Sequence, residues 1–282
     1  MRAMARDGSP PMAFRFVLPF LLVGCGAEDT DLTKVTDLSW DASEVAEVVV
    51  SQERGDLSFE AGWGDQAEAR VTRSCSGKDE SEAQRRLDAV QLTDHLAQGR
   101  LSVLSAPGTG CEVTLDFVLP TEVHVEAWTN EGSVDLAGLE GGARLRAEDG
   151  DVEVLGAAGG LDVEVGTGDL TVVSHSGGVS AAVTRGTVDC DIQILADGDE
   201  VDLVDAAGNV DLRLPPDASC EFDAMASPGW VTIDGFDAVS LSTDEQGHKA
   251  GIIGDPPVRT AIAVRAGSDD FAEQSEIRIN AR

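Results

Sequence analysis

Three consecutive rows of 18 residues decide the fold of this chain of 282 residues. The rows read GSVDLAGLEGGARLRAED (132–149), GDVEVLGAAGGLDVEVGT (150–167) and GDLTVVSHSGGVSAAVTR (168–185). Glycine marks the start and the middle of each row, in alternating steps of 10 and 8 residues. A fourth row opens at Gly186 and carries a four-residue insertion, and looser openings follow at Gly208 and Gly229. A fixed period of this kind is typical of a repeat protein.

Each row contains two short segments in which apolar and polar residues alternate. Alternation at period two places the apolar residues on one face of a β-strand. Two strands and two glycine-marked turns form one coil, and successive coils stack about 4.8 Å apart with parallel pairing. An antiparallel β-sandwich is the alternative, but it has no reason to keep an 18-residue register. The rows therefore predict an all-β protein, a parallel β-solenoid over residues 45–282 with two strands per coil and a thin core.

The segments on either side of the rows are less regular. Residues 79–92 predict one short helix, in which Ala83, Leu87 and Val90 form an apolar stripe that packs on the solenoid as a flank or cap. Two late alternations predict strands that close the far end as an atypical last coil. They contain Ile262 and Val264, then Ile277 and Ile279.

The N-terminus has the features of an export signal. Residues 1–24 combine a basic start with a short apolar run that cannot span a bilayer. The run ends in Leu22-Val23-Gly24-Cys25, which resembles a bacterial lipobox. The resemblance implies that Cys25 becomes a lipidated N-terminus, that residues 25–44 form a tether, and that the protein resides in the bacterial cell envelope, on the outer membrane in a two-membrane cell. The alternatives are an ordinary cleaved signal with an incidental cysteine, or a start at Met12.

Charge narrows the classes of partner. The chain carries 52 Asp and Glu against 20 Lys and Arg, a formal net charge of −32. A surface this negative repels phosphate, which disfavours nucleic acid as a partner. The apolar runs are too short for a protein with several membrane spans.

The exported part of the chain contains four cysteines besides Cys25, which permits two disulfides. Cys75 and Cys111 flank the predicted helix at the end of one strand-like stretch and the start of another, so this pair is favoured. Cys190 and Cys220 both fall at inward positions that we expect in adjacent coils. They either bridge the core or remain two buried thiols.

Carboxylates line the outward columns of the rows, where like charges one coil apart repel. Solvated acidic faces account for this pattern, and calcium bridging is the alternative. The weak calcium candidates are Asp149, Asp151, Asp197 and Asp199. The repeated Gly-Gly-x-Gly-x-Asp motif of calcium-binding RTX rolls is absent from the rows.

No pattern in the sequence predicts catalysis. The chain lacks the nucleophile-elbow, P-loop, dinucleotide and HExxH motifs. The four histidines are dispersed, at His95, His124, His175 and His248, and no CxxC or Cys/His cluster predicts zinc. We therefore predict a non-enzymatic protein without a cofactor.

The texture GxVxVxGxxGGxxVxV, followed by Leu212-Arg213-Leu214-Pro215-Pro216-Asp217-Ala218 and Val231-Thr232-Ile233, resembles the bacterial "putative adhesin" domains, also called Toastrack-type domains. The resemblance covers roughly residues 45–282 and implies a β-solenoid at the bacterial envelope, with no family active site. Two functions follow as hypotheses. The first is a lipid-anchored adhesin-like or scaffold module that binds a protein or glycan along a sheet face. The second is an envelope-stress sensing or assembly component that acts through a membrane partner.

Overall fold

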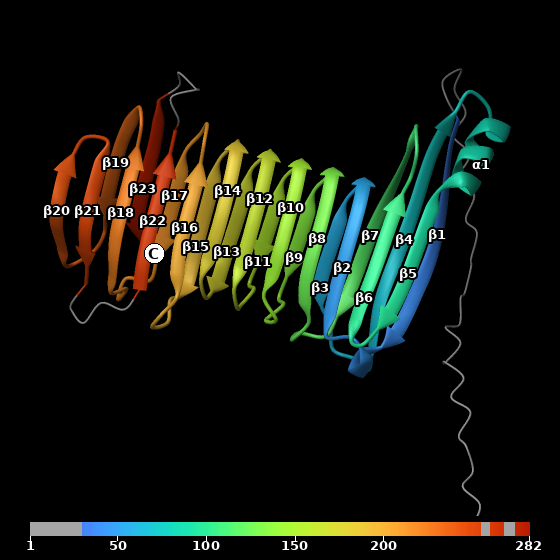
Figure 1. The fold of residues 1–282 in the computed structure, drawn as a ribbon, viewed down its shortest axis with the longest axis horizontal. Coiled ribbons are helices and arrows are strands. Elements are labelled where there is room, and N and C mark those ends of the chain that lie inside the picture. The colour runs from blue at the N-terminus through green and yellow to red at the C-terminus, as the bar shows by residue number, and fades with distance from the viewer. Residues whose placement is uncertain (1–29, 255–259, 268–273) are drawn as a thin grey trace, which may run out of the picture.

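The protein is an elongated stack of two long β-sheets (Figure 1), seen in a computed structural model that describes residues 30–254, 260–267 and 274–282. Sheet A has the strand order β1 (Thr30–Asp41), β4 (Gln66–Gly77), β7 (Cys111–Leu119), β3 (Leu57–Ala61), β9 (Val134–Ala137), β11 (Val152–Leu155), β13 (Leu170–Ser176), β15 (Val188–Ile194), β17 (Val210–Leu214), β23 (Ser275–Ala281) and β19 (Gly229–Asp234).

Sheet B lies across the core from sheet A. Its strand order is β20 (Val239–Glu245), β21 (His248–Ile253), β18 (Cys220–Ala226), β22 (Thr260–Ala266), β16 (Glu200–Asp205), β14 (Val179–Arg185), β12 (Leu161–Thr167), β10 (Ala143–Asp149), β8 (His124–Glu131), β2 (Glu47–Arg54), β6 (Arg100–Ala106) and β5 (Gln91–Ala97).

The central coils have the predicted 18-residue register. Val152 of β11 pairs in parallel with Val134 and Leu170, and Leu161 of β12 pairs with Ala143 and Val179. These side chains are at most 4% exposed. The prediction of a parallel β-solenoid with two strands per coil is confirmed. Glycine occupies the corners because the coils approach closely there.

The coil order departs from the sequence order at the far end. β22 lies between β16 and β18, and β23 lies between β17 and β19. The prediction that these two strands close the stack is therefore wrong, and their apolar residues are buried inside it. A reason lies in their composition: β22 and β23 are rich in Ile, Val and Ala and can be covered on both sides, whereas β20 carries acids that suit an edge. The buried residues are Ile262, Val264, Ile277 and Ile279.

The near end contains a second such insertion and an unexpected strand. β2 pairs with both β6 and β8, and β3 pairs with both β7 and β9. Residues 30–41, expected within the tether, form β1, which pairs antiparallel with β4 along its whole length. Leu32, Leu38 and Trp40 face the core from β1. Burial of these three apolar side chains outweighs the polar character of the residues between them.

Helix α1 (Glu80–Ala89) lies within the predicted span 79–92. A short 3-10 helix, η1 (Ala42–Glu44), connects β1 to β2. Asp79 caps α1 by accepting a 2.8 Å hydrogen bond from the Glu82 N–H. Ala83 and Leu87 are buried, and the helix packs on β1 and β4 at one end of the stack (Figure 1). Within the described ranges, no helix has the length and apolar character that crossing a membrane requires.

Candidate functional site

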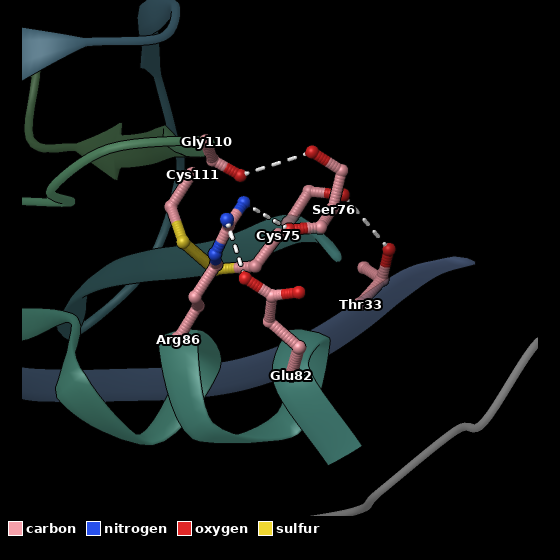
Figure 2. The surroundings of a disulfide bond; sticks show 8 residues. Thr33, Cys75, Ser76, Glu82, Arg86, Gly110 and Cys111 are labelled. Carbon is pink, nitrogen blue, oxygen red and sulfur yellow. Dashed lines mark hydrogen bonds and ion pairs between the residues drawn. A yellow bond between two sulfur atoms is a disulfide. The ribbon is translucent and has the colours of Figure 1, made fainter. Parts of the chain in front are cut away.

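The Cys75–Cys111 disulfide joins β4 to β7 beside α1 (Figure 2). The two cysteines are direct partners in the antiparallel ladder, with Cα atoms 4.1 Å apart. Arg86 of α1 donates a 2.6 Å hydrogen bond to the Ser76 carbonyl and forms an ion pair with Glu82. The structure thus contains the pair that the sequence favoured, and the disulfide and Arg86 together secure the helix end of the solenoid.

The other two cysteines are separate buried thiols. Cys190 lies in β15 of sheet A and Cys220 lies in β18 of sheet B. Along the stack, the inserted coil of β22 and β23 lies between the coils that contain these two cysteines. The expectation of adjacent coils is wrong because the sequence does not reveal this insertion. Burial raises the pKa of the Cys190 thiol to about 12 and that of Cys220 to about 11. Both side chains therefore act as small apolar residues.

Corner carboxylates hold neighbouring coils together. Asp56 accepts a 2.9 Å hydrogen bond from the Ser133 N–H, and Asp151 accepts one of 2.8 Å from the Asp169 N–H. Asp169 in turn accepts from the Thr187 N–H at 2.8 Å. Asp151, one of the four weak calcium candidates, thus accepts a hydrogen bond from the backbone of the next coil.

The other three calcium candidates do not form one cluster with Asp151. Asp149 ends β10 beside Asp151, whereas Asp197 and Asp199 lie in the β15–β16 turn at the opposite edge of the solenoid. Asp199 accepts a 2.7 Å hydrogen bond from the Ala196 N–H, which closes that turn. Across the part of the chain that the structure describes, no group of three or more His, Cys, Asp or Glu residues is arranged to hold a metal ion.

The four histidines occupy four different strands, β5, β8, β13 and β21. His175 is buried after a bulge at Ser174, and its Nε2 lies 3.1 Å from the Gly159 carbonyl oxygen. Burial lowers the pKa of His175. His248 lies on the surface with its Nε2 2.9 Å from Asp223. The fold does not bring these rings together.

Asp205 is a buried acid at the end of β16. One carboxylate oxygen accepts a 3.0 Å hydrogen bond from the Ala207 N–H, and the other has no hydrogen-bond partner. Burial is the main cause that raises the pKa of Asp205 to about 6. Because this pKa lies above the value in the unfolded chain, ionisation of Asp205 destabilises the fold as the pH rises through about 6.

Replacing Asp205 with Asn should therefore stabilise the protein at pH 8, by about 3 kcal/mol for a pKa raised from 3.8 to about 6, at 1.36 kcal/mol per pKa unit. The difference from the wild type should shrink as the pH falls from 6 towards 4, where Asp205 is protonated in the folded state. Urea unfolding at pH 8 and pH 4 measures both values. Exposed Asp202→Asn on the same strand is the control. Equal stability of Asp205→Asn and the wild type at pH 8 would contradict the assignment.

Side chains from neighbouring strands on the outer face of sheet B form the candidate binding site. Trp128 of β8 is 48% exposed, with Arg146 of β10 on one side and Ser51 of β2 on the other. The Arg146 guanidinium carbon lies 5.4 Å from the centre of the indole ring. Ser51 is small, so the ring stands above its neighbour on that side. The resulting hollow of about 230 Å³ extends along β2, β8, β10 and β12.

Ion pairs fix the polar side chains around this hollow. Arg146 pairs with Glu164 at 3.3 Å and also with Glu148. Arg144 pairs with Asp162 at 3.1 Å. On the other side of Trp128, Arg100 bridges Glu47 and Glu126, each at 3.3 Å. Each of these three arginines is thus held by carboxylates of neighbouring strands. The ion pairs keep hydrogen-bond donors and acceptors in fixed positions around the Trp128 ring.

A larger hollow of about 690 Å³ lies on the outer face of sheet A, over β1, β4, β7 and β3. Its rim is mostly carboxylate, with Arg70 paired to Asp37 at 3.2 Å. It lacks an exposed aromatic ring, so it offers less for recognising a ligand.

The Trp128 site was not among the sites predicted from the sequence. The one available signal was the alternation in His124–Glu131, where Val125, Ala127 and Thr129 face inward and Trp128 must therefore face outward. The predicted export signal, residues 1–24, and the predicted lipidation site, Cys25, lie outside the described residues.

Comparisons with known proteins add little about the ligand. The protein matches no family model and no curated protein. Three solved structures are similar to this chain at low scores. A "putative cell adhesion protein" from Clostridium sporogenes has a TM-score of 0.36 and 9% identity, covering 90% of this chain and all of the other.

The other two are "putative adhesins". One from Bacteroides fragilis has a TM-score of 0.40 and 9% identity, covering 87% of this chain and 97% of the other. One from Parabacteroides merdae has a TM-score of 0.29 and 12% identity, covering 88% and 96%. At these scores the likeness supports no conclusion about this protein.

Proposed function

We propose that the protein is a non-enzymatic, adhesin-like module of the bacterial cell envelope that binds a neutral glycan on the outer face of sheet B. The exposed indole of Trp128, framed by fixed arginine–carboxylate pairs, is the observation that carries the proposal. The apolar C–H face of a pyranose packs on an indole, while its hydroxyls bond to the surrounding charged groups.

Size and charge favour a neutral glycan over other ligands. The hollow of about 230 Å³ offers one aromatic ring, whereas a stable protein interface needs a larger apolar centre. The formal net charge of −32 repels anionic polysaccharides.

The Cys75–Cys111 disulfide supports placement in an oxidising compartment outside the cytoplasm. We further propose that Cys25, at the end of the lipobox-like motif, carries the lipid that attaches the protein to its membrane. Mass spectrometry of the mature N-terminus tests this, and an unmodified N-terminus would exclude it.

Trp128→Ala should weaken glycan binding about 30-fold or more, because truncating a central aromatic anchor costs about 2 kcal/mol. Calorimetric titration with neutral gluco-, manno- and N-acetylchito-oligosaccharides measures the loss. Trp63→Ala is the matched control, since Trp63 is fully exposed in the β3–β4 loop outside the hollow. Wild-type affinity in Trp128→Ala, or no binding of any neutral sugar by the wild type, would refute the proposed site.

A further inference from the structure

The last described strand at the far end of the solenoid, β20, carries two exposed apolar side chains. Among the strands that the structure describes, β20 is the last of sheet B and pairs only with β21 (Figure 1). Val239 is 40% exposed and Leu241 is 39% exposed. They are unlike Leu92 and Leu96 of β5, the edge strand at the other end of sheet B, which pack against the core.

The register shows that Val239 and Leu241 point to the core side of the sheet. Val239 pairs with Ile253, which is fully buried, and Leu241 pairs with buried Gly251. Direct partners in an antiparallel ladder share a face. The two side chains are nevertheless exposed because sheet A ends at β19, so that β20 extends beyond the facing sheet.

The edge of β19 is partly closed, whereas that of β20 is open. The Val231 N–H of β19 donates a 3.0 Å hydrogen bond to the Gln246 carbonyl in the β20–β21 turn. Among the described strands, none pairs with the outer edge of β20. Unpaired N–H and C=O groups along such an edge form a template for one more strand.

The charge around this edge selects the partner. Asp234, Asp237, Asp244 and Glu245 are exposed on β19, β20 and the segment between them. Lys249 pairs with Asp244. Two copies joined through this end would bring the acids together, whereas a cationic strand would neutralise them.

We propose that the β20 edge binds an extended segment of another protein in which apolar residues alternate with Lys or Arg. The segment adds as a strand beside β20, its apolar residues lie next to Val239 and Leu241, and its cations face the acids of this end. The site is separate from the Trp128 hollow and does not depend on glycan binding.

A synthetic peptide alternating Lys and Val tests the proposal in calorimetric titration, with hydrogen exchange reporting which amides become protected. We expect binding, with protection confined to residues 239–245. Leu241→Lys should weaken binding about tenfold or more, because a lysine at the edge opposes both the apolar contact and the cations. Val239→Lys should act in the same way, and thermal unfolding verifies that both variants fold.

The controls separate strand addition from simple charge attraction. Leu155→Lys changes a comparably exposed leucine on the outer face of sheet A and should leave binding unchanged. A peptide of the same composition with Lys and Val in separate blocks should not bind. Equal binding of both peptides, protection elsewhere, or unchanged affinity in both β20 variants overturns the proposal. Sedimentation that shows the protein associating with itself through Leu241 also overturns it, in favour of a second copy.

Discussion

Val163→Asp is expected to unfold the solenoid or to remove most of its stability. Val163 lies in the middle of β12, is 1% exposed, and pairs with Leu145 and Ala181 in the neighbouring coils. An aspartate there would place a carboxylate in a thin apolar core without a partner. Such burial costs several kcal/mol, roughly 4 or more, out of a typical stability of about 5–15 kcal/mol.

Circular dichroism during thermal and urea unfolding measures this effect. Ala182→Asp is the matched control, because Ala182 is the next residue along β14 from Ala181 and faces solvent. This variant should unfold within about 0.5 kcal/mol of the wild type. A melting temperature of Val163→Asp equal to that of the wild type would mean that the inward face has been assigned wrongly.

Gly150→Ala is expected to have the second largest effect. Gly150 has φ of +153°, and an added Cβ would lie 2.1 Å from the Gly132 carbonyl oxygen of the preceding coil. That oxygen belongs to the backbone and cannot move without separating the two coils, which hydrogen bonds such as Gly132 N–H to Asp149 C=O hold together. We expect a loss of roughly 2–4 kcal/mol in the free energy of unfolding.

Gly160→Ala in the same coil supplies the comparison. An added Cβ at Gly160 meets nothing within 4 Å, and the backbone there is compatible with alanine. This variant should differ from the wild type by less than about 0.5 kcal/mol. If both variants lose the same stability in urea unfolding, the close contact at the Gly150 corner is not what constrains the position.

The coil and its register could be predicted from the sequence because each is local. The 18-residue rows place Val152 beside Val134 and Leu170 without any knowledge of the rest of the chain. The order of the outer coils could not be predicted in this way. Ile262 and Ile277 show the same inward alternation whether their strands end the stack or lie inside it, and only the complete arrangement distinguishes the two.

The candidate site was difficult to predict for a related reason. Trp128, Arg146 and Arg100 lie on three separate strands, and β2 and β8 become neighbours only because the first coils are inserted out of order. Acidic residues were chosen as site candidates instead, because they are numerous in the sequence. Asp151 then proved to hold the next coil by a hydrogen bond, a role that composition alone does not reveal.

The early start of β1 has a consequence for how the protein would sit in the cell. With Thr30 already in the first strand, only residues 26–29 separate it from Cys25. Five peptide steps reach at most about 18 Å. A lipid on Cys25 would therefore hold the α1 end of the solenoid close to the lipid headgroups. The β20 end, at the opposite limit of the stack, would then be the part of the molecule able to reach furthest into the surroundings.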